Sequence, residues 1–208
     1  MITQDSLQKF LDDLSGSAPT PGGGSAAAIM GAVGAALVSM VCNVTLGKKG
    51  QEGAATEMQN VRAASEQLRA RLMAMVAEDV AAFDGLMSAY RLPKSDAEQK
   101  SRRGAAIQAS LRSATQTPLD CARACAQVIS LARRAGNDGY AGVISDAGVA
   151  VLAAFAALRS AALNVYVNAP SLEDRAFAIE ATAALEALLE SAASETEAVF
   201  AAVRTRMG

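Results

Sequence analysis

Apolar and small residues recur at helical spacing along almost the whole chain of 208 residues. No stretch alternates apolar and polar residues as a half-buried strand would, and no internal repeat or long linker divides the sequence. The spacing predicts helices over about residues 4–14, 25–46, 52–91, from 95 onward, from 117 to 136, 142–168 and 171–206. We therefore expect one all-α domain over residues 1–208, a single bundle of long antiparallel helices.

Local signals place several helix boundaries. Leu92-Pro93 ends the third helix, because proline disfavours a helical residue before it. The spacing of Ser95-x-x-Glu98 is a capping-box signature, and Ser171-x-x-Asp174 is expected to cap the last helix. Thr117-Pro118 fits an N-cap followed by proline at the first helical position, so a new helix is predicted to begin there.

Three consecutive glycines, Gly22, Gly23 and Gly24, precede Ser25 at the start of the second predicted helix. Glycine lets backbone N–H groups approach a ligand without interference from a Cβ atom, and the first N–H groups of a helix lack intrahelical partners. That arrangement suits an anionic or carbonyl-bearing ligand. At the other end of the helix, Lys48 and Lys49 supply positive charge. The sequence thus predicts a binding group at each end of one buried helix.

The same run, residues 26–46, is uncharged and about long enough to span a bilayer. Alanine and glycine dominate it, and Ser39, Asn43 and Thr45 lie inside it, which suits the central helix of a soluble bundle better than lipid. Asp5 and two further aspartates precede the run, so we do not expect a secretory signal. The expectation is a cytoplasmic protein with no membrane partner.

Composition narrows the chemistry. The chain has no histidine, which excludes Ser-His-Asp and Cys-His nucleophiles and every histidine-ligated metal site. Proton transfer near neutral pH then needs a carboxylate, lysine, cysteine or tyrosine. A net charge of −2 without a basic aromatic patch gives no reason to expect nucleic acid. Cys42, Cys121 and Cys125 have no framework spacing, so buried, reduced thiols are expected and no metal.

One carboxylate falls on an apolar helix face. At 100° per residue, Asp79 lies at the centre of a stripe formed by Val61, Leu68, Leu72, Met75, Phe83, Leu86 and Tyr90. A carboxylate facing a core either pairs with a cation or takes a raised pKa. A salt bridge to an arginine and a catalytic role are both open at this point, because structural networks perturb carboxylates too.

A second helical face carries small and polar residues. Asp146, Ser160, Asn164 and Asn168 share it with several alanines, a pattern that permits close helix approach or forms the wall of a cleft. Asp146 and Asn164 are about 27 Å apart along the helix, so one small site in one chain cannot easily use both. Asp146 can also act as a helix cap, and Asn164 and Asn168 can satisfy backbone groups.

Together these segments resemble the cyclodeaminase/cyclohydrolase family of folate enzymes. The resemblance rests on Pro21-Gly-Gly-Gly-Ser25 with its helix ending Gly47-Lys48-Lys49, on Glu78-Asp79-x-x-Ala82-Phe83 leading to Leu92-Pro93-Lys94, on Arg102-Arg103, and on Ser145-Asp146-x-x-Val149 leading to Asn164-Val165-x-x-Asn168. The segments occur in the family's order over nearly the whole chain, and the length resembles the free-standing form of these enzymes.

The resemblance implies an all-helical homodimer that hydrolyses 5,10-methenyltetrahydrofolate to 10-formyltetrahydrofolate without a cofactor. Asp79 is the expected base and Lys94 or Lys48 the expected proton donor or oxyanion partner, if burial lowers its pKa, with Asp146 at the pterin or in proton transfer. Gly22–Ser25, Lys49, Arg103 and Asn164 are the expected substrate contacts.

Two alternatives remain open from the sequence. Formiminotetrahydrofolate cyclodeamination uses the same methenyl species, and no residue here separates the two reactions. A non-catalytic folate-binding helical protein is the second alternative. A phosphate-binding P-loop is excluded, because no Gly-Lys-Ser/Thr follows the glycines.

Overall fold

The computed structural model describes residues 6–207. Within that range it contains six α-helices and no strand: α1 (Leu7–Leu14), α2 (Gly23–Leu46), α3 (Ala55–Arg91), α4 (Ala97–Asp138), α5 (Ile144–Asn168) and α6 (Arg175–Arg206). Single 3₁₀ turns precede α3 and α5 and follow α5. The expected all-α bundle of long antiparallel helices is confirmed.

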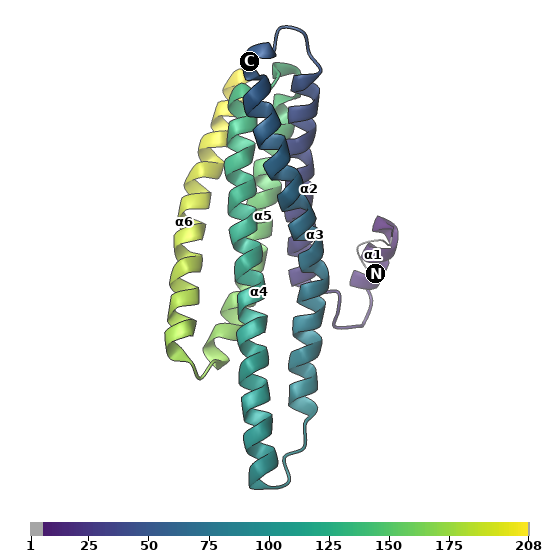
Figure 1. Cartoon of the computed structure of the whole chain (residues 1–208), viewed down its shortest axis with the longest axis vertical. Helices are drawn as coiled ribbons and strands as arrows, with labels where there is room; N and C mark the ends of the chain where they lie inside the picture. The colour runs from purple at the N-terminus through teal and green to yellow at the C-terminus, as the bar shows by residue number, and fades with distance from the viewer. Residues whose placement is uncertain (1–5, 208) are drawn as a thin grey trace.

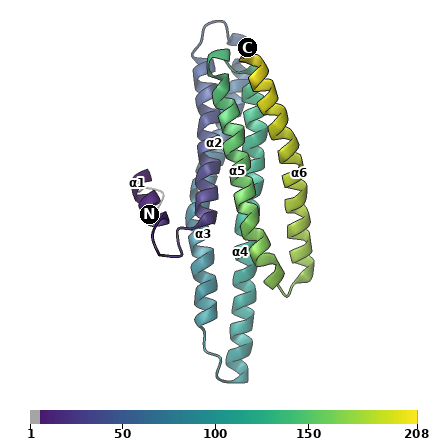
Figure 2. The same ribbon diagram turned by 180° about the vertical axis from the view of Figure 1, so that it is seen from behind.

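Helices α2 to α5 run alternately up and down and form a four-helix bundle, and α6 packs outside it along α4 and α5 (Figure 1). Figure 2 shows α2 and α5 side by side with α6 on the other side of α5. The lower end of the bundle is defined as the end at which α2 begins in Figure 1.

The core is built mainly from alanine, with valine and leucine next, and the many small side chains let the helices approach closely. At Gly34 an added Cβ would lie 3.0 Å from the carbonyl oxygen of Ala150 and 3.4 Å from Ala154. Because the two helices pack so closely here, the crossing has no room for a larger side chain. The same contact fixes the register of the pair, since it sets the middle of α2 level with the middle of α5.

Two helices of the described chain are long and apolar enough to cross a membrane, Gly23–Leu46 and the span Ala141–Ser171. In the bundle, 61% of the apolar window of the first and 44% of the second is buried. Helix α2 is thus a core helix here, as its alanine and glycine content predicts, whereas α5 keeps an exposed apolar side.

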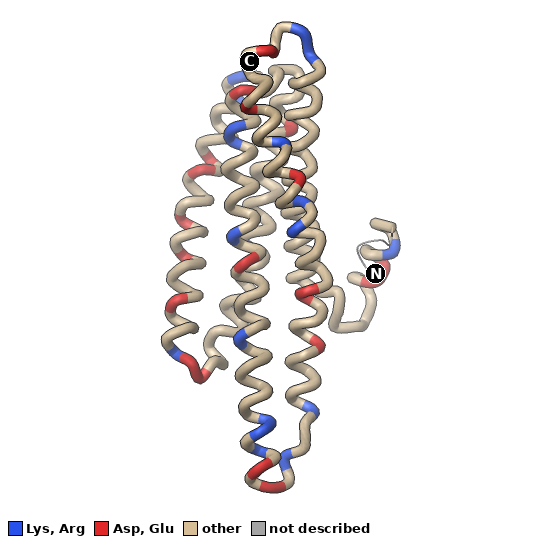
Figure 3. Tube along the Cα trace, viewed as in Figure 1, with Lys and Arg blue, Asp and Glu red and all other residues tan. Residues whose placement is uncertain are grey.

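Helices α3 and α4 continue well below the start of α2 and end in a projecting hairpin (Figure 2). Residues of both charges gather at the lower end of this hairpin, and lysine marks the turn that follows α2 (Figure 3). Below Gly23 the four-helix bundle therefore lacks one of its helices, while α3, α4 and α5 continue. Helix α1 stands off to the side of the bundle on a loop, with Leu7 and Leu11 exposed.

Several predicted boundaries need correction. No helix begins at Thr117-Pro118, because α4 runs through Pro118 without a break. The N-cap of α4 is Asp96 rather than Ser95, and its carboxylate accepts a hydrogen bond from the N–H of Gln99. Asp174 itself caps α6 by accepting from the N–H of Phe177. The predicted start of the first helix at residue 4, and Asp5, lie outside the described residues.

Candidate functional site

A cavity of about 320 Å³ lies where the bundle loses its fourth helix. Its walls come from α3, α4 and α5, with Asp79 at the top and Met87 further down α3. The lining consists of Asp79, Ala82, Phe83, Leu86, Met87, Ala114, Thr117, Pro118, Asn164, Val167 and Asn168. This volume falls in the range of about 300–1,000 Å³ typical of small-molecule sites.

The start of α2 closes the top of this cavity. Gly24 and Asp79 line the same narrow recess immediately above it. The N-cap Gly22 has no side chain to bind the first N–H groups of the helix, so their partial positive charge is directed at this level of the bundle. The predicted binding group at Gly22–Ser25, at the start of α2, therefore lies beside Asp79, which is on α3.

Asp79 is half-buried and is held by a hydrogen bond that the sequence did not predict. The hydroxyl of Ser25, itself fully buried, donates to Asp79 Oδ2 over 2.8 Å. No arginine forms an ion pair with Asp79 among residues 6–207, so the salt bridge left open by the sequence is absent there. A carboxylate fixed by one hydrogen bond at the edge of a cavity is placed to act on a bound ligand.

Gly24 is required by the close approach of this carboxylate. A Cβ at Gly24 would lie 2.6 Å from Asp79 Cγ and would overlap the carboxylate, whereas a Cβ at Gly23 meets nothing within 4 Å. The two neighbouring glycines thus have different roles. Gly24 makes room for Asp79, and Gly23 is exposed at the first position of α2.

Two asparagines on α5 form the opposite wall. Asn164 donates its amide N–H to the carbonyl of Ser160 over 3.3 Å, and Asn168 donates to the carbonyl of Ala114 over 2.8 Å. Both amide oxygens are left as acceptors at the cavity. Asn164 was expected in the site, whereas Asn168 was interpreted only as a residue that satisfies backbone, and Thr117 and Pro118 only as a helix start.

Lys48, Lys49 and Asp146 lie at the upper end, away from the cavity. Lys48 is exposed and its ammonium group lies 5.0 Å from the centre of the Tyr140 ring. Lys48 follows Gly24 by 24 residues of helix and turn, about 35 Å along α2. Asp146 is half-buried in the first turn of α5, where a negative charge stabilises the helix N-terminus. Within one chain these residues do not meet Asp79.

Lys94 and Arg103 lie at the other extreme, on the projecting hairpin. Arg103 donates to the backbone carbonyl of Tyr90 over 3.2 Å, and Lys94 is exposed in the turn after α3. The helix rise from Asp79 to the end of α3 at Arg91 is about 18 Å. Within one chain neither Lys94 nor Lys48 is buried, and neither reaches the Asp79 cavity.

The three cysteines are free and buried, as expected. Burial raises the pKa of Cys42 to about 11. The pKa of Cys125 is raised by its hydrogen bond with Cys121 and by burial. Such thiols stay protonated at neutral pH and are poor nucleophiles. Among the described residues no three His, Cys, Asp or Glu side chains lie close enough together to hold a metal ion.

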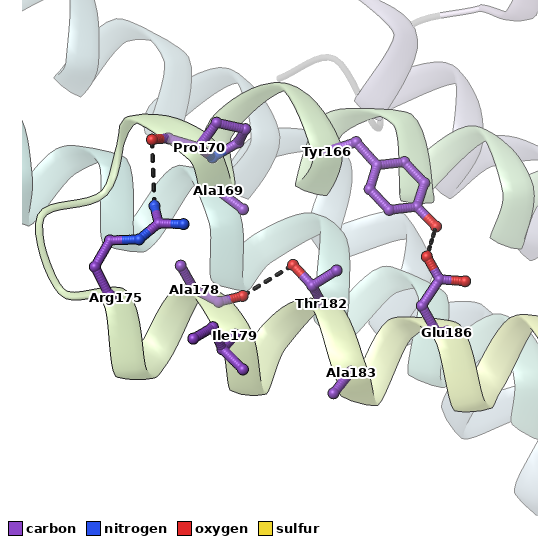
Figure 4. A pocket seen from close by; sticks show the side chains of 9 residues that line it. All are labelled: Tyr166, Ala169, Pro170, Arg175, Ala178, Ile179, Thr182, Ala183 and Glu186. Atoms are coloured by element: carbon purple, nitrogen blue, oxygen red, sulfur yellow. Dashed lines mark hydrogen bonds between the residues drawn. The ribbon is translucent and has the colours of Figure 1, made fainter.

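A second, larger hollow of about 500 Å³ lies between the lower part of α5 and the start of α6 (Figure 4). Its charged and polar side chains form hydrogen bonds within the chain. Tyr166 donates to Glu186 over 2.5 Å, and Arg175 donates to the carbonyl of Pro170 over 3.3 Å. It brings together none of the predicted site residues, and the Asp79 cavity is therefore the candidate functional site.

The Asp79 cavity is rich in acceptors and poor in cations. Its polar lining consists of the Asp79 carboxylate, two asparagine amides that each donate one N–H to a backbone carbonyl, and the hydroxyl of Thr117. Phe83, Leu86, Met87 and Val167 supply apolar surface for a planar ring. The arrangement can hold a flat, donor-bearing or cationic heterocycle with one carboxylate beside it.

Comparison with known proteins identifies the family of this chain. The family model of formiminotransferase-cyclodeaminase matches residues 6–187. The chain is 53% identical over 207 residues to the methenyltetrahydrofolate cyclohydrolase of Methylorubrum extorquens, with all of both chains covered. It is 30% identical to the formimidoyltransferase-cyclodeaminase of Mus musculus, of which it spans 38%. The crystal structure of formiminotetrahydrofolate cyclodeaminase from Thermotoga maritima superposes with a TM-score of 0.83 at 26% identity, covering 100% of this chain and 98% of that one. The chain therefore belongs to the formiminotransferase-cyclodeaminase family.

Proposed function

We propose that this protein hydrolyses 5,10-methenyltetrahydrofolate to 10-formyltetrahydrofolate, reversibly and without a cofactor, in the cytoplasm. The observation that carries the proposal is the half-buried Asp79 carboxylate, fixed by Ser25 at the top of an acceptor-rich cavity. The 53% identity to a methenyltetrahydrofolate cyclohydrolase over the full length supports the choice of reaction.

The substrate suits this cavity in charge. Its one-carbon unit is an amidinium cation between two ring nitrogens, and a carboxylate beside it stabilises that charge at low dielectric. The cation is electrophilic enough for water to add without metal assistance. A cavity lined by acceptors and without a lysine or arginine binds such a ligand and disfavours an anionic one.

Asp79 is the proposed general base. One carboxylate oxygen accepts from Ser25, and the other accepts a proton from the water that attacks the one-carbon atom. The C–O bond forms, a tetrahedral intermediate results, and the C–N5 bond breaks as N5 takes up a proton. The sum is substrate cation plus water giving the formyl product and one proton. A positioned base of this kind contributes about 10²–10⁴-fold.

The test supplies the purified protein with each candidate substrate and follows the absorbance of the methenyl chromophore. Methenyltetrahydrofolate should lose absorbance as it is hydrolysed. Formiminotetrahydrofolate should instead gain methenyl absorbance and release ammonia if the protein is a cyclodeaminase, the activity named for the Thermotoga relative. Tetrahydrofolate binding without either change would identify a non-catalytic folate-binding protein.

We further propose that the active form is a homodimer joined through α2 and α5. Helix α5 carries one exposed apolar stripe, and the neighbouring helix α2 carries the exposed Val33. The exposed members of the stripe are Val149, Leu152, Leu163 and Val167. Val167 also lines the Asp79 cavity, so a second copy on this stripe borders the cavity and excludes water from it.

The segments that resemble the folate-enzyme family lie at both ends of the bundle, and an antiparallel pairing of two copies explains this arrangement. A twofold axis at the level of Val33 and Leu152 brings the upper end of one copy to the lower end of the other. Lys48 and Asp146 of the second copy then approach the cavity that holds Asp79. The exposed lysines and the uncompensated carboxylate are complementary in charge.

Sedimentation of Val33→Asp tests this interface. A charge at the centre of the stripe should shift the protein from dimer to monomer, whereas Phe200→Asp, on α6, should remain dimeric. A wild-type monomer, or dissociation by Phe200→Asp alone, would contradict the α2–α5 interface.

A further inference from the structure

Pro118 interrupts the hydrogen bonding of α4 beside the Asp79 cavity. In a regular helix the N–H at position 118 would donate to the carbonyl of Ala114, but proline has no N–H. Ala114 is buried, so its carbonyl needs a donor from elsewhere. The donor is the side chain of Asn168, which reaches across from α5 over 2.8 Å.

This contact fixes the orientation of the Asn168 amide. Because a carbonyl only accepts, the Asn168 side chain must present its nitrogen to Ala114 and therefore turns its oxygen the other way. Asn168 lines the cavity, and its oxygen accepts from no donor among residues 6–207. One turn earlier on α5, Asn164 also donates its N–H to a backbone carbonyl, so it presents an oxygen in the same way.

We infer that Asn168 orients the substrate by accepting a hydrogen bond from an N–H donor of the pterin ring, with its acceptor direction set by Pro118 through the Ala114 carbonyl. This inference rests on the proposed function. The pyrimidine half of a tetrahydropterin carries ring N–H and exocyclic amino donors. With those donors at Asn168 on α5, the one-carbon end of the ring system faces Asp79 on α3.

Four proteins test the inference: wild type, Asn168→Ala, Pro118→Ala and the double variant Asn168→Ala/Pro118→Ala. Asn168→Ala leaves the buried Ala114 carbonyl without a donor, so the melting temperature should fall. In the double variant the backbone N–H of residue 118 donates to Ala114 again, and the melting temperature should recover relative to Asn168→Ala. Asn60→Ala, an exposed asparagine on α3, is the control and should change neither stability nor binding.

Ligand affinity separates orientation from stability. Tetrahydrofolate and a tail-free tetrahydropterin should bind about tenfold more weakly to Asn168→Ala and equally weakly to the double variant, since one hydrogen bond to the ligand is lost in both. Affinity for p-aminobenzoylglutamate, which lacks the pterin, should not change. Recovery of pterin affinity together with the melting temperature in the double variant would make Asn168 purely structural and overturn the inference.

The outcomes also separate the inference from the proposed function. A wild type that hydrolyses methenyltetrahydrofolate, combined with full pterin affinity in the double variant, overturns only the role of Asn168. A wild type that neither turns over the substrate nor binds tetrahydropterin overturns both.

Discussion

The two ends of the α2–α5 pair use their polar residues differently. At the lower end, Ser25 holds Asp79 at the edge of a cavity, and Asn164 offers an acceptor from α5. At the upper end the polar groups bind one another across a closed turn. The N–H of Tyr140 donates to the buried Thr45 hydroxyl, and Lys48 lies over the Tyr140 ring. The lower end is arranged for a ligand, and within one chain the upper end is arranged for stability.

This difference shows that residues of similar chemistry form a ligand site only where the helix pair leaves a cavity beside them. Both ends expose charged groups, but only the lower end lacks a packing partner, because α2 begins there and α3, α4 and α5 continue. The upper end becomes part of a site only if another copy carries it to the cavity.

Asp79→Asn should produce the largest loss. Asparagine keeps the size of the side chain and can still accept from Ser25, so the fold should survive, but it cannot take a proton from water. We expect kcat to fall by about 10²–10⁴-fold in a methenyl hydrolysis assay. Asp84→Asn, an exposed aspartate on the same helix, is the matched control. Near-normal turnover by folded Asp79→Asn would remove Asp79 as the base.

Gly24→Ala should come next, and Gly23→Ala should be nearly silent. The added methyl group at Gly24 overlaps the Asp79 carboxylate and displaces it, whereas at Gly23 it meets open space. A displacement of about 1 Å in a catalytic group can cost about 10²-fold in kcat/KM. Steady-state kinetics of the two variants, with circular dichroism to confirm folding, make the comparison. Equal kinetics for both would mean that this close approach has no role in activity.

Subunit mixing tests whether the upper end serves the site of a second copy. Lys48→Ala should lower kcat/KM about tenfold, and a co-expressed mixture with Asp79→Asn should regain up to about a quarter of wild-type activity, because each mixed dimer keeps one intact site. Lys94→Ala, on the hairpin, is the matched lysine control. If mixing restores nothing while Lys48→Ala alone is impaired, Lys48 acts within its own chain.

The smallest effect concerns stability at the upper half of α2. The pKa of Cys42 is raised by burial to about 11, so the folded state holds the thiol proton more tightly than the unfolded chain does. The resulting stability is complete below the unfolded pKa of about 8.5 and is lost as the pH rises towards the folded value. Melting temperatures should therefore fall less steeply with pH for Cys42→Ala than for the wild type. Parallel pH profiles would contradict this assignment, and activity at neutral pH should be unchanged.

Much of this fold can be predicted from the sequence because its helices are governed by local periodicity. The stripe centred on Asp79 and the small-residue face of α5 both follow from helical spacing, and they form two walls of the cavity. Gly24 and Ser25, in the predicted binding loop, contact Asp79. The hydrogen bond between Ser25 and Asp79 joins residues 54 positions apart, and no local pattern announces it.

The failure at Pro118 has the same physical origin. Thr117-Pro118 has the local form of a helix start, and the donor that lets α4 continue through it comes from Asn168, on another helix. Local rules describe which backbone groups a proline leaves without a hydrogen-bond partner. They do not say which distant side chain supplies the missing donor. Lys48, Lys94 and Asp146 were grouped by resemblance, and the geometry of a single chain separates them.

The short reach of α2 has one further consequence. Since the cavity occupies the volume that this helix would fill if it began earlier, its depth is governed by the position of a single N-cap. One more helical turn before Gly22 would advance the helix by about 5.4 Å and obstruct the space beside Asp79. Lengthening or shortening the segment ahead of the glycines is thus a route by which relatives can admit bulkier or smaller molecules while every wall residue stays the same.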